Sequence, residues 1–218
     1  METDARQPPR NGSATAPREL KGIFSIVDGA SGSRKMLEDR VRSGFGTHFG
    51  ACIAGFMRQL TAYRHASGAT GVIGIRSAAD ESLYLENYLE EPVERIISRL
   101  AGCPVGRCRI VEVGQFVVDD REIVVDFFLD LVPFLRSLGF DWICFTGTDR
   151  IRAILARMGL QGYPVAPATA ERVNHLGDRW GTYYDNDPVV TIGSLSDPAG
   201  RWLEGHADAL RPARQRAG

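Results

Sequence analysis

The chain has 218 residues, of which 44% are hydrophobic and 24% are charged, as expected for an ordinary globular domain. Its 26 basic and 27 acidic residues leave a formal net charge of -1, so no global field draws it to nucleic acid or to an anionic membrane. The N-terminal residues lack the apolar run of an export signal, and no window approaches the roughly 18 apolar residues of a membrane span. We therefore expect a cytoplasmic protein without nucleic-acid or membrane partners.

Composition divides the chain into three parts. Residues 1–20 are rich in Pro, Arg, Ser, Thr and Ala and have almost nothing to bury, so we predict a disordered arm. The C-terminal residues are similar in composition, and we predict a flexible tail over residues 201–218. Residues 21–200 contain no internal repeat or low-complexity stretch and are predicted to form a single domain.

The first part of this domain contains the patterns of a strand, a helix and a hairpin. IFSIV (23–27) is a short strand candidate, and residues 33–56 are predicted to be largely helical. Two β-rich runs, FMRQLTAYRH (56–65) and GVIGIRS (71–77), flank a short link that contains Gly68. This arrangement is typical of a β-hairpin.

A helix, a strand and a second helix are predicted next. ESLYLENYLEEPVERIISRLAG (81–102) is acidic and is predicted to be helical. RIVEVGQFVV (109–118) is rich in β-branched residues and is predicted to be a strand. In the helix predicted over residues 121–140, Asp126 and Asp130 form a narrow polar stripe on an otherwise apolar cylinder. We expect this helix to pack closely against the sheet.

The remaining segments complete a mixed sheet. DWICFTGT (141–148) predicts a buried strand, and DRIRAILARMGL (149–160) predicts a helix that ends at Gly159. YPVAPA (163–168) and WGTYYDNDPVVTIG (180–193) supply two further strands. The order of elements predicts an α/β domain with a mixed sheet, flanking helices and a central pair of parallel strands.

Glu112 is the most informative residue, because it stands in the middle of an apolar strand. Period-2 alternation places Glu112, Gly114, Phe116 and Val118 on one face of that strand. A carboxylate there must be paired, solvated in a cleft or shifted in pKa. Two interpretations remain open: an ion pair with an arginine, or a general base or anchor for a substrate amine.

Gly114 interrupts this otherwise β-branched strand two residues after Glu112. Strand glycines often mark a bulge, or the close approach of another backbone or a ligand. A splayed strand beside a carboxylate would form a substrate slot.

Four ordered motifs between about Arg34 and Ser194 resemble the thermostable hemolysin family. They are ESLYLENYLEEPVE (81–94), RIVEVGQF (109–116), GFDWICFTGT (139–148) and WGTYYDNDP (180–188). The usual family form of the second motif is E-V-G-N, whereas this chain has Gln115 in the last position. The family is similar in predicted fold to GCN5-related N-acetyltransferases (GNATs), and its E-V-G motif resembles the E-x-S-R-F strand of acyl-homoserine-lactone synthases.

The resemblance implies a single-domain, GNAT-like fold with an acyl donor lodged between two splayed central strands, here 109–118 and 141–148. It assigns Glu112 to the acceptor amine and the opened strand around Gly114 to the thioester arm. A backbone amide between Gln115 and Val117, with Phe116 between them, would hold the oxyanion.

One departure concerns the donor. Ordinary GNATs follow the first of these strands with an R/Q-x-x-G-x-G/A loop, whose amides hold the coenzyme A pyrophosphate. This chain has VVDDREIV there, with Asp119 and Asp120 where phosphates would bind. We therefore expect no tightly bound cofactor, and a thioester donor carried by an acyl carrier protein or another activated donor in preference to acetyl-coenzyme A.

Four further residues are candidates for the site, and three of them also have a structural interpretation. Tyr184 could protonate a leaving thiolate, with Trp180 lining the same cleft, although core and turn packing explain both aromatics as well. Glu86 belongs to a family motif, yet an acidic helix is more often a solvated face. Thr146 lies at the end of the second central strand, where it could contact substrate.

The sequence lacks the motifs that are typical of several other catalytic classes. Cys103 and Cys108 lack C-x-x-C spacing and an H-x-x-x-H partner, so no metal site is predicted. No G-x-S-x-G, P-loop or G-x-G-x-x-G sequence is present. The resemblance to the thermostable hemolysin family implies a small-molecule acyltransferase that uses a thioester donor and an amine acceptor. The alternatives are a membrane-lytic hemolysin and a catalytically silent binding module of the same fold.

Overall fold

The computed structural model describes residues 19–27, 29, 32–176 and 179–197. The predicted arm, apart from Glu19 and Leu20, and the predicted tail lie outside the described residues.

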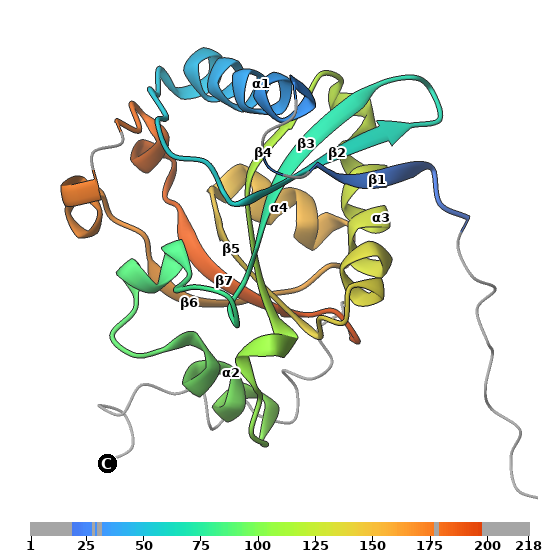
Figure 1. Ribbon diagram of the computed structural model, residues 1–218. Coiled ribbons are helices and arrows are strands. Elements are labelled where there is room, and N and C mark those ends of the chain that lie inside the picture. Colours follow the sequence, from blue (N-terminus) through green and yellow to red (C-terminus); the bar gives the residue numbers. More distant parts are fainter. Residues whose placement is uncertain (1–18, 28, 30–31, 177–178, 198–218) are drawn as a thin grey trace, which may run out of the picture.

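The described residues form one seven-stranded sheet with helices on both faces (Figure 1). The strand order is β1-β2-β3-β4-β5-β7-β6. The strands are β1 (Gly22–Val27), β2 (Gln59–His65), β3 (Thr70–Ser77), β4 (Ile110–Val118), β5 (Trp142–Gly147), β6 (Tyr163–Pro167) and β7 (Val189–Ser194). The α-helices are α1 (Gly32–Phe49), α2 (Val93–Ala101), α3 (Val124–Ser137) and α4 (Asp149–Arg157). This order matches the α/β sequence of elements predicted above.

Helices α3 and α4 cover one face of the sheet, and α1 and α2 cover the other. On the first face, Phe127, Leu131 and Leu135 of α3 pack against Val111 and Val113 of β4. The opposite face has two clusters, one beneath α1 and one between α2 and the strands. Apolar burial on both faces explains why the central strands read as nearly continuous hydrophobic runs.

The polar stripe of α3 also faces the sheet. Asp130 is 1% exposed, and its carboxylate accepts a hydrogen bond from the Tyr63 hydroxyl at 2.8 Å and one from the Lys21 backbone N–H at 3.0 Å. Asp126 lies 3.3 Å from the His65 ring, also on β2. The two hydrogen bonds satisfy the carboxylate of Asp130, which the packing of α3 desolvates.

Strands β4 and β5 form the predicted parallel pair, but their pairing is short. It runs from Ile110 opposite Trp142 to Val113 opposite Phe145, and no further β4–β5 pair follows within the described residues. Strand β5 continues along β7, and β4 continues along β3. The two central strands therefore part after Val113 and Phe145.

A β-bulge lies at this point in β4. Gly114 pairs with Gly74, but the next residue pair along the two strands is Val117 with Val72, so β4 contains an extra residue. Gln115 has a φ of 54°, in the left-handed region that few non-glycine residues adopt. The bulge therefore marks a break in the regular strand.

The bulge overturns the predicted alternation beyond Gly114. Phe116 packs against Phe127 and Phe128 on the α3 face, where Val118 also lies. Glu112 instead contacts the turn that precedes α2, on the opposite face. The extra residue shifts the alternation of side chains between the two faces of the sheet. Phe116 and Val118 therefore lie on the face opposite to that of Glu112.

Candidate active site

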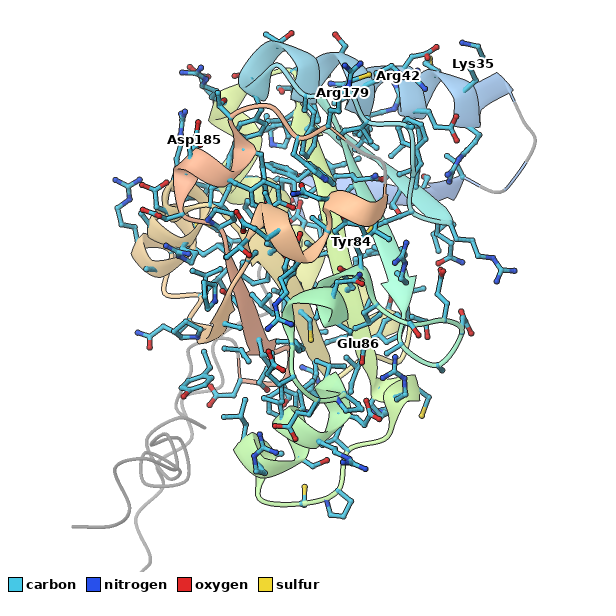
Figure 2. The ribbon with its side chains drawn as sticks, turned by 90° about the vertical axis from the view of Figure 1, so that its left-hand side faces the viewer. Lys35, Arg42, Tyr84, Glu86, Arg179 and Asp185 are labelled. Atoms are coloured by element: carbon cyan, nitrogen blue, oxygen red, sulfur yellow. The ribbon has the colours of Figure 1, made fainter. Side chains whose placement is uncertain are left out.

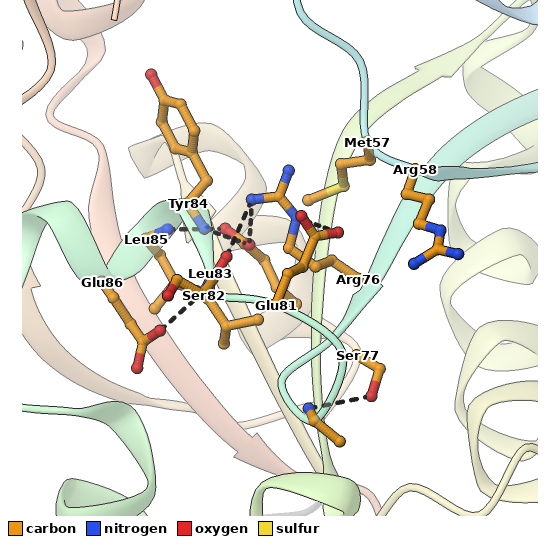
Figure 3. Close-up of polar contacts among 12 residues, drawn as sticks. Met57, Arg58, Arg76, Ser77, Glu81, Ser82, Leu83, Tyr84, Leu85 and Glu86 are labelled. Atoms are coloured by element: carbon orange, nitrogen blue, oxygen red, sulfur yellow. Dashed lines mark hydrogen bonds and ion pairs between the residues drawn. The ribbon is translucent and has the colours of Figure 1, made fainter. Parts of the chain in front are cut away.

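Glu112 lies just before the strand opening and is 3% exposed. Its two carboxylate oxygens accept hydrogen bonds from the backbone N–H groups of Tyr84, at 2.8 Å, and Leu85, at 2.9 Å. Arg76, its register partner on β3, places Nη1 3.8 Å from the carboxylate (Figure 3). Arg76 is thus the arginine that the ion-pair interpretation of Glu112 requires. The Glu112 carboxylate also fixes the turn that contains Tyr84.

The protonation of Glu112 is finely balanced. Burial raises the pKa of its carboxyl to about 7, although Arg76 and the N–H groups of Tyr84 and Leu85 favour the charged form. Both protonation states are therefore populated near neutral pH. Each carboxylate oxygen keeps a further lone pair beyond the one used by the backbone, so the group can exchange a proton with a bound molecule.

Glu86 has a different environment two residues after Tyr84. Its carboxylate accepts hydrogen bonds from the N–H groups of Leu83, at 2.8 Å, and Val93, at 3.1 Å, and forms a bidentate ion pair with Arg107 at 2.8 and 3.0 Å. Burial opposes ionisation, but Arg107 and the two N–H groups outweigh it, and the pKa is lowered. Glu86 therefore ties the turn to the start of α2.

The face of Gly114 is covered by Met57. A Cβ atom at Gly114 would lie 3.1 Å from Met57 Cε, and one at the neighbouring Gly74 would lie 2.6 Å from Met57 Sδ. The paired glycines therefore leave room for the Met57 side chain, where the interrupted strand predicted another backbone or a ligand. No local pattern in the sequence indicates that Met57 is the side chain at this position.

Gln115 holds the segment that carries Met57. Its Oε1 accepts a hydrogen bond from the Met57 N–H at 3.0 Å, and its Nε2 donates one to the Gly55 carbonyl at 2.9 Å. Val117 packs close to Gly44 of α1, beneath the same segment. The side-chain amide of Gln115 is thus occupied by the chain itself, which leaves backbone groups of residues 115–117 as the candidates for contact with a substrate.

Aromatic residues gather beside the opening on the Glu112 face. The Trp180 ring lies 6.0 Å from Tyr84 and 5.4 Å from Tyr183. Tyr183, which sequence analysis did not select, donates a hydrogen bond from its hydroxyl to the Thr146 carbonyl at 3.0 Å. The hydroxyl of Tyr184 lies 2.7 Å from that of Tyr88.

The predicted site residues separate into three groups. Glu112, Gly114 and Gln115 lie together at the bulge, and Trp180, Tyr184 and Thr146 join them through the aromatic cluster. Figure 2 looks onto this side of the molecule, with Arg179 near α1, Tyr84 at mid-height and Glu86 nearer α2. Phe116 and Val117 belong to packing on α3 and α1, and the carboxylate of Glu86 is engaged by Arg107.

Two residues of the site, Arg76 and Tyr84, were also not selected from the sequence. Their roles depend on contacts between β3, the turn after it and β4, which no local pattern reveals. Within the described residues, no group of three or more His, Cys, Asp or Glu side chains is placed to hold a metal ion.

Comparison with solved structures supports the fold. The AHL synthase LasI is similar with a TM-score of 0.50 and 11% sequence identity, over 86% of this chain and 96% of that one. FeeM, an N-acyl amino acid synthase from uncultured soil microbes, is similar with a TM-score of 0.49 and 16% identity, over 86% of this chain and 96% of that one. At such low identity the likeness to LasI concerns the fold alone, and it confirms the predicted single α/β domain with a mixed sheet.

No curated protein sequence matches the chain significantly. The sequence pattern of one family, described as thermostable hemolysin, matches residues 27–199, which include every strand from β2 to β7 and all four α-helices. The chain therefore belongs to the thermostable hemolysin family.

Proposed function

We propose that this protein transfers an acyl group from a thioester donor to a small amine acceptor. The observation that carries the proposal is the opening between β4 and β5 after Val113 and Phe145, with the bulge at Gly114 and Gln115 on one side of it. In this proposal the thioester arm lies between the parted strands, where backbone groups of β4 are no longer paired with β5.

The proposed reaction is attack of the amine nitrogen on the thioester carbonyl carbon. A C–N bond forms, the C–S bond breaks, and the products are an amide and a thiol. Glu112 receives the proton lost by the amine, a role for which a pKa of about 7 is suited. A backbone N–H between Gln115 and Val117 stabilises the oxyanion, and the Tyr184 hydroxyl protonates the leaving thiolate.

The donor we propose is a thioester on a carrier protein, because the start of α3 offers little to a free pyrophosphate. Asp120 accepts a hydrogen bond from the Glu122 N–H at 2.8 Å, and Asp119 is bound to Thr70 and lies 3.1 Å from Arg40. Two carboxylates thus stand at a helix N-terminus that would otherwise favour phosphate.

Glu112→Gln tests the proposal. The amide cannot accept a proton, so loss of a general base predicts a fall in turnover of roughly 100- to 10,000-fold. Asp130→Asn is the matched control, since Asp130 is a buried carboxylate on the opposite face of the sheet and accepts its hydrogen bonds from Tyr63 and Lys21. This control should lower the melting temperature and keep turnover.

Native mass spectrometry of freshly purified protein, searched for a retained thioester or acyl adduct, identifies the donor to use in that assay. Near-normal turnover of Glu112→Gln with a lowered melting temperature would show that the carboxylate only anchors Arg76 and the Tyr84 turn. Absence of any acyl transfer with carrier-bound or coenzyme A thioesters would leave the silent binding module as the better description.

A further inference from the structure

Arg76 is largely buried beside Glu112 but makes few close contacts. Its side chain is 16% exposed, and it stands opposite Glu112 in the β3–β4 register. Its one hydrogen bond within the described residues, from Nη1 to the Ser82 carbonyl, is 3.5 Å long. Nε lies 3.4 Å from Glu81 without a hydrogen bond, and Nη1 lies 3.8 Å from Glu112.

Arg107 shows what a structural arginine looks like in the same molecule. It donates from Nε to the Ala78 carbonyl at 2.6 Å and from its two terminal nitrogens to Glu86 and Glu94 at 2.6–3.0 Å. Arg76, in contrast, has a terminal nitrogen, Nη2, with no polar partner in the part of the chain that is described; Figure 3 draws its contacts through the other two nitrogens. A largely buried guanidinium with unused donors is suited to a bidentate anion.

We propose that Arg76 binds the carboxylate of the acceptor and that the acceptor is an α-amino acid, whose amine then lies at Glu112. This inference rests on the proposed function and names its substrate class. Arg76 is a substrate-binding residue in this scheme, and Glu112 keeps the role of proton acceptor.

The spacing of the two side chains fits this class of molecule. Arg76 Nη1 and the Glu112 carboxylate are 3.8 Å apart and project from paired positions of adjacent strands. In an α-amino acid, covalent geometry puts the amine nitrogen about 3 Å from the nearer carboxylate oxygen. One acceptor can therefore place its anionic group on the guanidinium and its amine against the carboxylate, with charges opposite to those of the two side chains.

The carboxylate of Glu81 would compete with the carboxylate of the acceptor for the Arg76 guanidinium. The Glu81 side chain is 39% exposed and lies 3.4 Å from Arg76 Nε, so an incoming carboxylate takes over part of this guanidinium. Removal of the Glu81 charge should strengthen binding of an amino acid, whereas removal of the planar Arg76 guanidinium should weaken it. A purely structural arginine would show no such opposition.

The experiment uses the full-length protein with three sets of probes: the common L-amino acids, their carboxamides, and the corresponding decarboxylated amines. Calorimetry measures binding of each set, and a transfer assay with the thioester donor measures KM and kcat. Wild type should prefer the best amino acid over its carboxamide by about 100-fold or more, because a buried ion-binding group rejects an analogue that leaves it unpaired.

The variants sharpen this test. Arg76→Lys keeps the charge but loses the planar fork, and should raise Kd and KM for the amino acid by roughly 10- to 100-fold with little change in kcat. Glu81→Gln should lower Kd by about 2- to 5-fold, as expected for removal of a partly exposed ion pair. Because Glu81 is at the surface, this second variant should remain folded even if Arg76→Lys does not.

The outcomes separate the inference from the proposed function. Transfer to decarboxylated amines as efficient as transfer to amino acids would overturn the inference and leave acyl transfer intact. Amino-acid binding that depends on Arg76 and Glu81, without any transfer, would support the inference and overturn the proposed reaction. Failure of every probe to bind or react, or equal effects of both variants on acids and carboxamides, would also overturn the assignment of Arg76.

Discussion

Glu112 shows how one residue can serve the fold while it remains chemically active. Its carboxylate joins β4 to a turn 28 residues earlier in the chain, through the N–H of Tyr84. The same burial that makes this contact strong also raises the pKa of the carboxyl to about 7. Stability and proton affinity are therefore linked at this position.

That link gives the stability a specific pH dependence. The pKa of Glu112 is about 7 in the folded chain and 4.5 in the ordinary carboxyl, so folding favours the protonated form. Its contribution is fully present below pH 4.5 and is lost as the pH rises to about 7. Over this window the free energy of unfolding of wild type, minus that of Glu112→Gln, should fall by about 3 kcal/mol in urea titrations.

Glu86→Gln provides the control of opposite sign. Because the folded-state pKa of Glu86 is lowered, its contribution is present above the ordinary value and is lost as the pH falls through the folded-state value. A difference curve for Glu112→Gln that stays flat between pH 4.5 and 7 would contradict the raised pKa.

Some residues of the candidate site could be predicted from the sequence, and others could not. The irregular strand at Gly114 was predicted and is confirmed by the bulge, because a charge and a glycine are conspicuous in a β-branched run. The partners Arg76, Tyr84 and Met57 were not selected, since each reaches β4 from a separate segment. Contacts of this kind depend on tertiary packing, which local periodicity does not encode.

At the scale of elements, the order of strands and helices followed from the sequence. Glycine stops and uninterrupted apolar runs, as in α4 and β5, are strong local signals. The helix predicted over residues 81–102 is only partly correct: residues 84–88 form a 3-10 turn, and α2 begins at Val93. The carboxylates of Glu86 and Glu112 bind N–H groups of this turn and so replace helical partners.

The start of α3 makes a prediction about free coenzyme A. Asp120 occupies the Glu122 N–H, and Asp119 adds a second negative charge, so pyrophosphate would meet repulsion in place of free amides. Calorimetry at physiological salt should show weak or undetectable binding of coenzyme A, and a carrier-bound acyl group should bind better. The double variant Asp119→Asn, Asp120→Asn should gain affinity for coenzyme A. Tight binding of coenzyme A by wild type would contradict this prediction and would favour an ordinary acetyltransferase.

At the scale of the whole molecule, most large apolar side chains of the described residues are buried in the core. They form three core clusters around the two faces of the sheet. Within the described residues, no helix is both long enough and apolar enough to span a bilayer. In the described part of the chain, the exposed large apolar residues are spread over several segments: Leu20, Ile23, Ile26, Met36, Val125, Leu138 and Leu176.

The lytic alternative can be tested directly on this basis. Purified protein at micromolar concentration should leave dye-loaded liposomes intact, because insertion of a large apolar face would require the core to unfold. A pore-forming peptide serves as the positive control. Rapid, protein-dependent dye release would rank lysis above acyl transfer.

The short parallel pairing of β4 and β5 also divides the sheet mechanically. Strands β1 to β4 form one antiparallel half-sheet, and β5, β7 and β6 form another, joined by four residue pairs between Ile110–Val113 and Trp142–Phe145. An extended molecule that lies beyond this seam, along the free stretch of β4, would lengthen the junction as a partial extra strand. Its binding energy would then add to the cohesion of two half-sheets whose strands pair with each other only over one end.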